Sequence, residues 1–197
     1  MRIIKILSLF LLLPLTASAQ DIAEPFKVGT FEIGGAPTVG IVLRDSLIME
    51  LDAANAALEK TATYPAVPMP ADMIELIERY DYGLKRRLYE IVNAHVENDR
   101  LDAAYVHEVG DVRTLPPIMY PGKILNAAVN FYSHVDEGGS DEERREARRL
   151  RREQRGVPYL FLKPSRGAVV GNGAPIVIPY GRNRTDWEVE LGAVIGR

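Results

Sequence analysis

The pattern of hydrophobic and polar positions predicts a β-hairpin near the start of the chain. Residues 26–33 and 38–43 alternate loosely between the two classes, and Gly34-Gly35-Ala36-Pro37 separates them with residues typical of a turn. A third short strand is expected at residues 47–51, and the alanine-rich residues 52–60 predict a helix. This order of elements predicts a small α+β domain.

Two further helices are predicted after a loop, residues 64–70, that contains three prolines. Asp72 is expected to cap the first helix, with Glu75 as the capping-box partner. The second helix is expected at residues 82–97, with apolar residues on one side and His95 near its end, where a histidine interacts favourably with the helix dipole. We assign no chemistry of its own to this part of the chain.

Candidate chemistry begins after a strand of small residues predicted at 124–129. His134 and Glu137 are three residues apart, so a helical turn would place them on one face within hydrogen-bonding reach. A carboxylate on one ring nitrogen raises the basicity of the other, which gives a general base or a group that activates water. The alternative is a loop histidine that happens to precede an acid.

The densely charged residues 140–155 begin with acids and end with arginines. This order complements a helix dipole, and Asp141 and Arg145 are spaced for one ion pair. We interpret the run as a solvated helix. A mobile lid beside His134, which would exclude water from a site, is the alternative.

A strand predicted at residues 158–163 ends in Lys163, which is either a contact for an anionic substrate or an exposed strand end. Another strand is expected at 176–179, and a last one contains Glu188 and Glu190. Side chains alternate along a strand, so these two glutamates would share a face, where a hard divalent cation such as Mg²⁺ or Ca²⁺ would relieve their repulsion. The alternative is the polar face of an ordinary amphipathic strand.

Composition and the first residues limit the class of protein. With 24 basic and 27 acidic residues in 197, the charge gives no support to nucleic-acid binding. The chain has no cysteine, which excludes disulfides and thiolate metal sites. A basic start, an apolar run and Ala17-Ser18-Ala19 predict a bacterial signal peptide at residues 1–19. We therefore expect an exported, periplasmic protein without stable membrane insertion.

The residues of the second half resemble the fumarylacetoacetate hydrolase superfamily. The resemblance rests on an ordered set of motifs: Asn130-Phe131-Tyr132-Ser133-His134-Val135-Asp136-Glu137, then Phe161-Leu162-Lys163-Pro164, then Asp186-Trp187-Glu188-Val189-Glu190-Leu191, and Val194-Ile195-Gly196. It extends from about residue 111 to the end, and the hairpin is similar to the smaller leading domain of that family. Phe131 replaces the usual tyrosine, and the insertion at 138–156 is longer than in many members.

This resemblance implies a β-rich α+β fold. A small α+β domain at residues 20–110 would precede a catalytic domain of mixed β-sandwich or roll type from residue 111 to 197. Glu188 and Glu190 would match two of three metal carboxylates, and His134 and Glu137 would match the catalytic dyad on a lid segment. The third metal aspartate and a catalytic lysine of the family lie downstream of Glu190, so we expect an incomplete, inactive fragment of a longer enzyme.

The implied activity is metal-dependent hydrolysis of C–C bonds in small 2-oxo or diketo carboxylic acids, with decarboxylation, isomerisation or hydration as other possibilities. The expected cofactor is Mg²⁺, with Mn²⁺ or Ca²⁺ as substitutes, Lys163 would steer the substrate carboxylate, and the full-length protein is expected to be a homodimer. One rival is an exported binding or structural domain with a degenerate metal site. A second, a cupin-like transition-metal enzyme, needs several ligating histidines.

Overall fold

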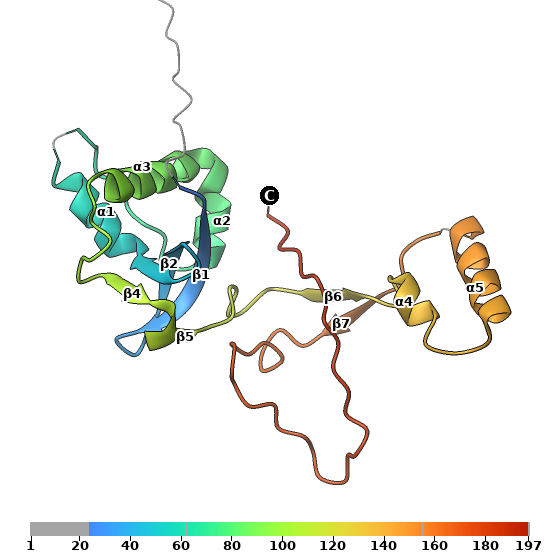
Figure 1. Ribbon diagram of the computed structural model, residues 1–197. Helices are drawn as coiled ribbons and strands as arrows, with labels where there is room; N and C mark the ends of the chain where they lie inside the picture. Colours follow the sequence, from blue (N-terminus) through green and yellow to red (C-terminus); the bar gives the residue numbers. More distant parts are fainter. Residues whose placement is uncertain (1–23, 62, 155, 197) are drawn as a thin grey trace, which may run out of the picture.

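The computed structural model describes residues 24–61, 63–154 and 156–196 (Figure 1). The predicted signal peptide lies outside these residues. Within them, a compact first unit is followed by a two-stranded ribbon, two helices and a long irregular segment. No helix in this part of the chain is both long and apolar enough to cross a membrane.

The first unit is built on a curled antiparallel sheet with the strand order β4-β3-β2-β1-β5. The hairpin is formed by β1 (Phe26–Ile33) and β2 (Ala36–Leu43), joined by Gly34 and Gly35, both at positive φ. Glycine adopts this conformation without a steric penalty, which suits a two-residue hairpin loop. The remaining strands are β3 (Leu47–Glu50), β4 (Val106–Glu108) and β5 (Arg113–Thr114).

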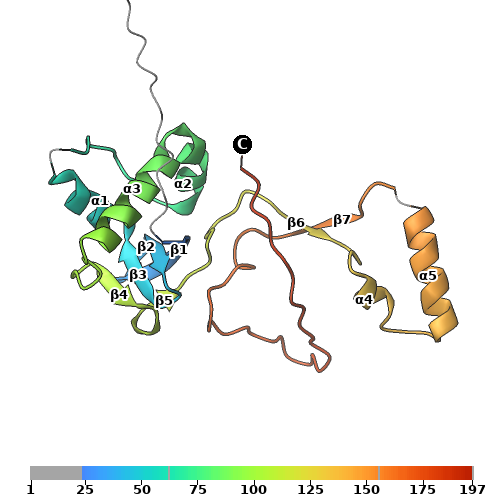
Figure 2. The same ribbon diagram turned by 45° about the horizontal axis from the view of Figure 1, so that its top comes forward.

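Three helices cover one face of this sheet: α1 (Leu51–Glu59), α2 (Met73–Arg79) and α3 (Leu84–Glu97). Short 3-10 turns occupy Tyr80–Tyr82 and Val109–Asp111. Figure 2 shows the helices packed together on the sheet. Their apolar stripes meet the inward side chains of β2 and β3 in one core, which contains Ile41, Leu43, Met49, Leu51, Leu58, Leu76, Leu88, Ile91 and Val92.

Local sequence signals account for the beginning of α2. The Asp72 carboxylate accepts a hydrogen bond from the Glu75 amide at 2.9 Å, as the capping pattern predicts. The return bond differs, because the Glu75 carboxylate accepts from the Ala71 amide at 2.8 Å. His95 is almost fully buried, with ring nitrogens 2.8 Å from the Ile91 carbonyl oxygen and 2.9 Å from the Tyr105 hydroxyl. Burial lowers its pKa, so it is a neutral core residue rather than a charged partner of the helix dipole.

Two glycines that face each other in the hairpin make room for a buried aromatic ring. Gly29 and Gly40 are paired in register, and the Phe31 ring lies over both. A β-carbon on Gly40 would lie 2.8 Å from Phe31 and 2.8 Å from Ile48, and one on Gly29 would lie 2.9 Å from Phe31. The missing side chains therefore allow Phe31 to fill the face of the sheet opposite the main helical core.

The second part contains less regular structure than the sequence predicts. Its ribbon pairs β6 (Ile124–Ala127) with β7 (Leu160–Lys163), and its helices are α4 (Tyr132–Val135) and α5 (Asp141–Glu153). The strand expected at 176–179 and the one expected around Glu188 and Glu190 are not formed, and both stretches are irregular and exposed. A strand needs a hydrogen-bonded neighbour, and the described residues supply none there. The described chain is thus a mixed α and β structure with a curled sheet, and the sandwich or roll stays a prediction.

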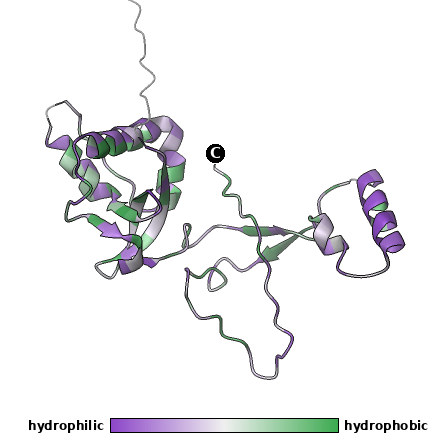
Figure 3. Ribbon diagram, viewed as in Figure 1, coloured by the Kyte–Doolittle hydropathy of each residue, from purple (hydrophilic) through white to green (hydrophobic). Residues whose placement is uncertain are grey.

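The irregular segment touches the first unit at two places where glycine permits a close approach. A β-carbon on Gly171 would lie 2.5 Å from the carbonyl oxygen of Thr114, and one on Gly196 would lie 3.2 Å from Ile77 of α2. Figure 3 shows the contrast in polarity between the hydrophilic α5 and the mainly apolar ribbon. The two parts of the chain therefore meet at β5 and α2, while α4 and α5 lie at the far end of the ribbon (Figure 1).

Candidate active site

The ribbon ends in a short turn of helix that carries the predicted dyad. After β6, the chain passes through Val129, at a φ of 48°, and enters α4. The His134 Nδ1 atom lies 2.9 Å from Oε1 of Glu137. The helical turn brings together two residues three apart in the sequence, in the arrangement that the spacing predicts.

This contact sets the protonation behaviour of the histidine. The hydrogen bond that the His134 ring donates to Glu137, together with the negative charge of that carboxylate, raises the pKa of His134, and the charge of Glu188 adds to this effect. Desolvation and the positive charge of Arg151 act in the opposite direction. The imidazole is 42% exposed, so a small molecule can reach it. A solvent-accessible histidine held by a carboxylate is suited to accept and release a proton.

Glu188 lies within electrostatic reach of His134 although it is far away in the sequence. Its charge acts on His134, so the irregular segment passes within electrostatic reach of α4. Glu190 follows on the same exposed segment. Among the described residues, no group of three or more His, Cys, Asp and Glu side chains could hold a metal ion. The donor type at Glu188 and Glu190 suits a hard cation, but two carboxylates supply only part of its six or more oxygen ligands.

Lys163 lies further from the dyad than the sequence suggested. It is paired with Ile124, whereas Ala127, at the α4 end of the ribbon, is paired with Leu160. Three residues of strand separate the two ends, roughly 10 Å at the usual rise per residue. The Lys163 ammonium lies 6.0 Å from the centroid of the Phe161 ring. The structure therefore does not bring Lys163 directly to His134.

The other two histidines are engaged elsewhere. His95 is in the core, and His107 Nε2 lies 2.7 Å from Oε1 of Glu50 in the first unit. A transition-metal site with several histidine ligands is not assembled in the part of the chain described. The cupin-like alternative is therefore not supported.

The charged helix α5 contributes contacts that the sequence did not indicate. Its start is a capping box, in which Ser140 accepts from the Glu143 amide and Glu143 accepts from the Ser140 amide; the Ser-x-x-Glu pattern is the signal that reveals it. Asp141 pairs with Arg144 at 3.5 Å, not with Arg145 as predicted. Further along, Arg148 and Arg151 reach Asp136 and Val129 respectively. These contacts connect α5 to the segment that carries the dyad, and no periodic pattern could have revealed them.

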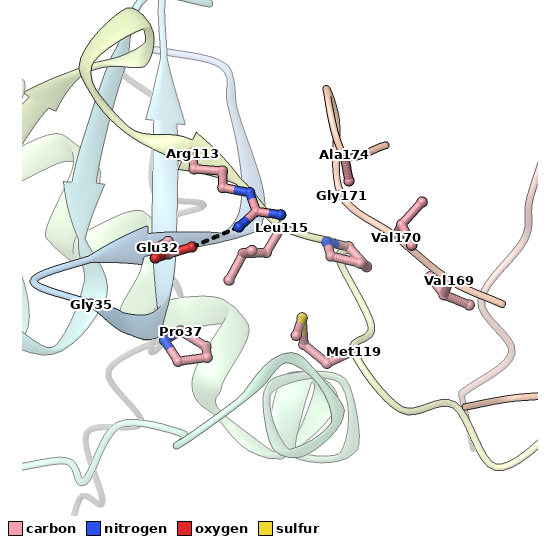
Figure 4. Close-up of a pocket in the computed structure, with 11 residues that line it drawn as sticks. Glu32, Gly35, Pro37, Arg113, Leu115, Met119, Val169, Val170, Gly171 and Ala174 are labelled. Atoms are coloured by element: carbon pink, nitrogen blue, oxygen red, sulfur yellow. Dashed lines mark hydrogen bonds and ion pairs between the residues drawn. The ribbon is translucent and has the colours of Figure 1, made fainter. Parts of the chain in front are cut away.

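A separate pocket lies between the hairpin and the irregular segment (Figure 4). It has a volume of about 410 Å³, and its lining includes the Glu32–Arg113 ion pair at 3.3 Å, Met119, Val170 and Gly171. None of the five predicted site residues lines it. The pocket is therefore distinct from the candidate active site.

Comparison with known proteins supports the resemblance seen in the motifs. Residues 123–197 match the family described as the C-terminal domain of fumarylacetoacetate (FAA) hydrolase. Maleylpyruvate hydrolase of Aquipseudomonas alcaligenes is 33% identical over 89 residues, which are 45% of this chain and 31% of that protein. Oxaloacetate tautomerase YisK of Bacillus subtilis is 28% identical over 174 residues, 87% of this chain and 52% of that protein.

An uncharacterized protein of Pyrococcus horikoshii is 34% identical over 77 residues, 39% of this chain and 28% of its own length. The chain thus spans about half or less of the length of these relatives. The matches support membership of the fumarylacetoacetate hydrolase superfamily, most directly for residues 123–197. Enzymes of this family generally depend on a divalent metal ion.

Proposed function

We propose that this chain belongs to an enzyme that acts on small 2-oxo or diketo carboxylic acids, as a C–C hydrolase or an isomerase. The observation that carries the proposal is the 2.9 Å contact between His134 and Glu137, with the charge of Glu188 acting on the same imidazole. Two relatives named for maleylpyruvate hydrolysis and oxaloacetate tautomerisation support this substrate class. The tautomerase matches 87% of this chain, which favours proton transfer as the core chemistry.

In this proposal the two nitrogens of His134 have different tasks. Nδ1–H donates to Glu137, which leaves Nε2 to accept a proton. In tautomerisation, Nε2 takes the proton from the carbon beside the keto group and returns it to the enolate oxygen. In hydrolysis, Nε2 takes a proton from a water molecule as the water oxygen adds to the keto carbon. The C–C bond then breaks to give a carboxylate and an enolate, and the enolate carbon takes the proton back from the imidazolium. In both reactions, Glu137 stabilises the imidazolium form.

Glu188 and Glu190 are the residues that would hold the metal, for which we propose Mg²⁺, with Mn²⁺ or Ca²⁺ as alternatives. The ion would stabilise the negative charge that develops on the oxygens of the substrate. We keep Lys163 as the proposed contact for a substrate carboxylate, although the substrate would have to bridge the length of the ribbon to reach both Lys163 and His134.

Metal binding gives a direct test on this chain. Titration with MgCl₂ in a calorimeter should give weak binding, because the described residues offer two carboxylates. Glu188→Gln and Glu190→Gln should each abolish it, whereas Glu142→Gln, an exposed acid in the first turn of α5, should not. Equal binding by all four proteins would contradict the assignment of the ligands.

Turnover and binding of a substrate mimic test the dyad separately. We expect the 197-residue chain to be inactive with oxaloacetate and maleylpyruvate, since two ligands hold the ion weakly. Magnesium-dependent turnover by this chain would overturn that expectation. Oxalate, which resembles a 2-oxo acid, should shift the NMR signals of the His134 ring in the presence of MgCl₂ and leave those of His107 unchanged. A shift at neither ring would count against the proposed substrate class.

The main rival is a binding or structural domain without activity. The finding that favours it is the lack of a group of three ligands among the described residues. Under this rival, neither Mg²⁺ nor oxalate would change the His134 signals.

We also propose that the protein is exported to the periplasm after cleavage behind Ala19 and that its full-length form is a homodimer. Mass spectrometry of the secreted protein should give a chain that begins at Gln20. Light scattering should give twice the mass of one chain.

A further inference from the structure

Two arginines of α5 reach back to the turn that carries His134. Arg148 and Arg151 are three residues apart, so they lie on the same side of the helix. The Nε atom of Arg148 donates to Oδ1 of Asp136 at 2.9 Å, and its Nη2 pairs with Oδ2 of the same carboxylate. The guanidinium also lies 5.8 Å from the centroid of the Tyr132 ring. Arg148 therefore contacts α4 at both ends, at Tyr132 where the helix begins and at Asp136 just after it ends. The contact with Asp136 consists of two charge-assisted hydrogen bonds, which are stronger than bonds between neutral groups.

Arg151 holds the chain just before α4. Its Nη1 atom donates to the carbonyl oxygen of Val129 at 2.6 Å. Val129 has a φ of 48°, in the left-handed region, which is unfavourable for a β-branched side chain. Strained backbone of this kind persists only where surrounding contacts hold it, and it is common at functional sites.

The turn needs support from outside. α4 has only four residues, and its N-cap Phe131 makes no side-chain hydrogen bond to it. A single helical turn is unstable by itself because the cost of nucleation exceeds the gain from so few hydrogen bonds. The spacing of His134 and Glu137 brings them into contact only while this turn is helical.

We propose that Arg148 and Arg151 are positioning residues that fasten α4 to α5 and thereby hold His134 against Glu137. The catalytic meaning of this fastening rests on the proposed function, but the fastening itself is measurable without turnover. The arginine-rich helix would then be a support for the proton-transfer pair, which is more than the solvated helix that the sequence predicts.

The helix offers a matched control. Arg149 is paired within α5, with Glu146 on one side and Glu153 on the other. Arg149→Met removes the same charge from the same helix without touching the segment at 129–136. The NMR titration of the His134 ring then reports on its contact with Glu137, because that contact is the main cause of its raised pKa.

The first test is the double variant Asp136→Asn/Arg148→Met, which removes one charge of each sign. We expect the pKa of His134 to fall toward the ordinary imidazole value of about 6.5. Exchange of the amide hydrogen of residue 136, which is bonded to the Tyr132 carbonyl at 3.1 Å in the native chain, should become about three- to tenfold faster relative to the intrinsic rate of the residue present. Arg148→Lys keeps the charge but loses the two-nitrogen contact with the Asp136 carboxylate, so its His134 pKa should lie between those of the native protein and the double variant. In Arg149→Met the pKa should stay raised.

Arg151→Met separates positioning from a simple effect of charge. Its charge acts to lower the pKa of His134, so loss of charge alone would raise that pKa. Loss of positioning would lower it. An unchanged or higher pKa in Arg151→Met removes Arg151 from the proposal, and an unchanged pKa in the double variant overturns the role of Arg148. If magnesium and oxalate fail to bind while these pKa shifts are observed, the proposed function fails and the fastening stands.

Discussion

Replacing Gly40 by alanine should destabilise the first unit, because the new methyl group has no space. Its β-carbon would lie 2.8 Å from Phe31 and 2.8 Å from Ile48. Carbon atoms pack best about 3.5–4.0 Å apart, so both neighbours would have to move by roughly 0.7 Å or more. Phe31 is 4% exposed and Ile48 0%, which leaves neither side chain an open direction.

The expected cost follows from two opposing effects. Overpacking of this kind typically costs about 1–3 kcal/mol. Alanine also reduces the conformational entropy of the unfolded chain, which stabilises the folded state by roughly 0.4–1 kcal/mol. We therefore expect Gly40→Ala to lower the free energy of unfolding by about 1–2 kcal/mol. Gly29→Ala should cost less, because its β-carbon meets Phe31 alone, at the tip of the ring.

Urea unfolding, followed by far-UV circular dichroism, measures this effect. A loss of about 1–2 kcal/mol should lower the urea midpoint by about 0.5–1 M. Gly122→Ala is the control, since nothing lies within 4 Å of its added β-carbon and its φ is not positive, and its midpoint should stay the same or rise slightly. Combining Gly40→Ala with Phe31→Leu should cost less than the sum of the two single variants. Equal midpoints for Gly40→Ala and Gly122→Ala would refute this account of the sheet.

Three further predictions concern single side chains. Glu137→Gln should lower the pKa of His134, measured by NMR titration, because a carboxylate on Nδ1 is the main cause of its rise; an unchanged pKa would show that the contact does not form in solution. Ser140→Ala should destabilise α5 by about 1 kcal/mol through loss of its capping box, seen as reduced helical circular dichroism; full helicity would contradict this. Burial lowers the pKa of His95 in the folded protein below the unfolded value of about 6.5, so the unfolded chain binds more protons at acid pH. The free energy of unfolding should therefore fall as the pH drops below about 6.5. His95→Gln should flatten this pH dependence of the urea midpoint.

The elements of the first unit could be predicted because their signals are local. Alternation and the Gly34-Gly35 turn fix the hairpin, whose first strand begins and ends where expected. The second strand begins two residues earlier than predicted, because Ala36 and Pro37 pair with Ile33 and Glu32. The burial of His95 could not be predicted, because its position near a helix end suggested a charged side chain. The Tyr105 hydroxyl, which comes from a later segment, forms a hydrogen bond with the neutral ring.

At the candidate site, only contacts between residues that are close together in the sequence could be predicted. The contact of His134 with Glu137 follows from helical geometry, but the approach of Glu188 depends on the path of the chain over more than fifty residues. The strand expected around Glu188 and Glu190 failed for a similar reason, since alternation indicates a strand without supplying its neighbour. Whether these carboxylates bind a metal stays a prediction.

The ribbon of β6 and β7 has a consequence for handling the protein. In the part of the chain described, each strand has one neighbour, so a row of amide and carbonyl groups faces outward on either side. Leu162 is 69% exposed and Tyr159 is 74% exposed, so apolar side chains are also accessible beside these backbone groups. Another copy can extend such a ribbon by backbone hydrogen bonds alone, so self-association should rise with protein concentration. Leu162→Lys should reduce this self-association, because natural sheets use charged side chains on edge strands to oppose pairing with another chain.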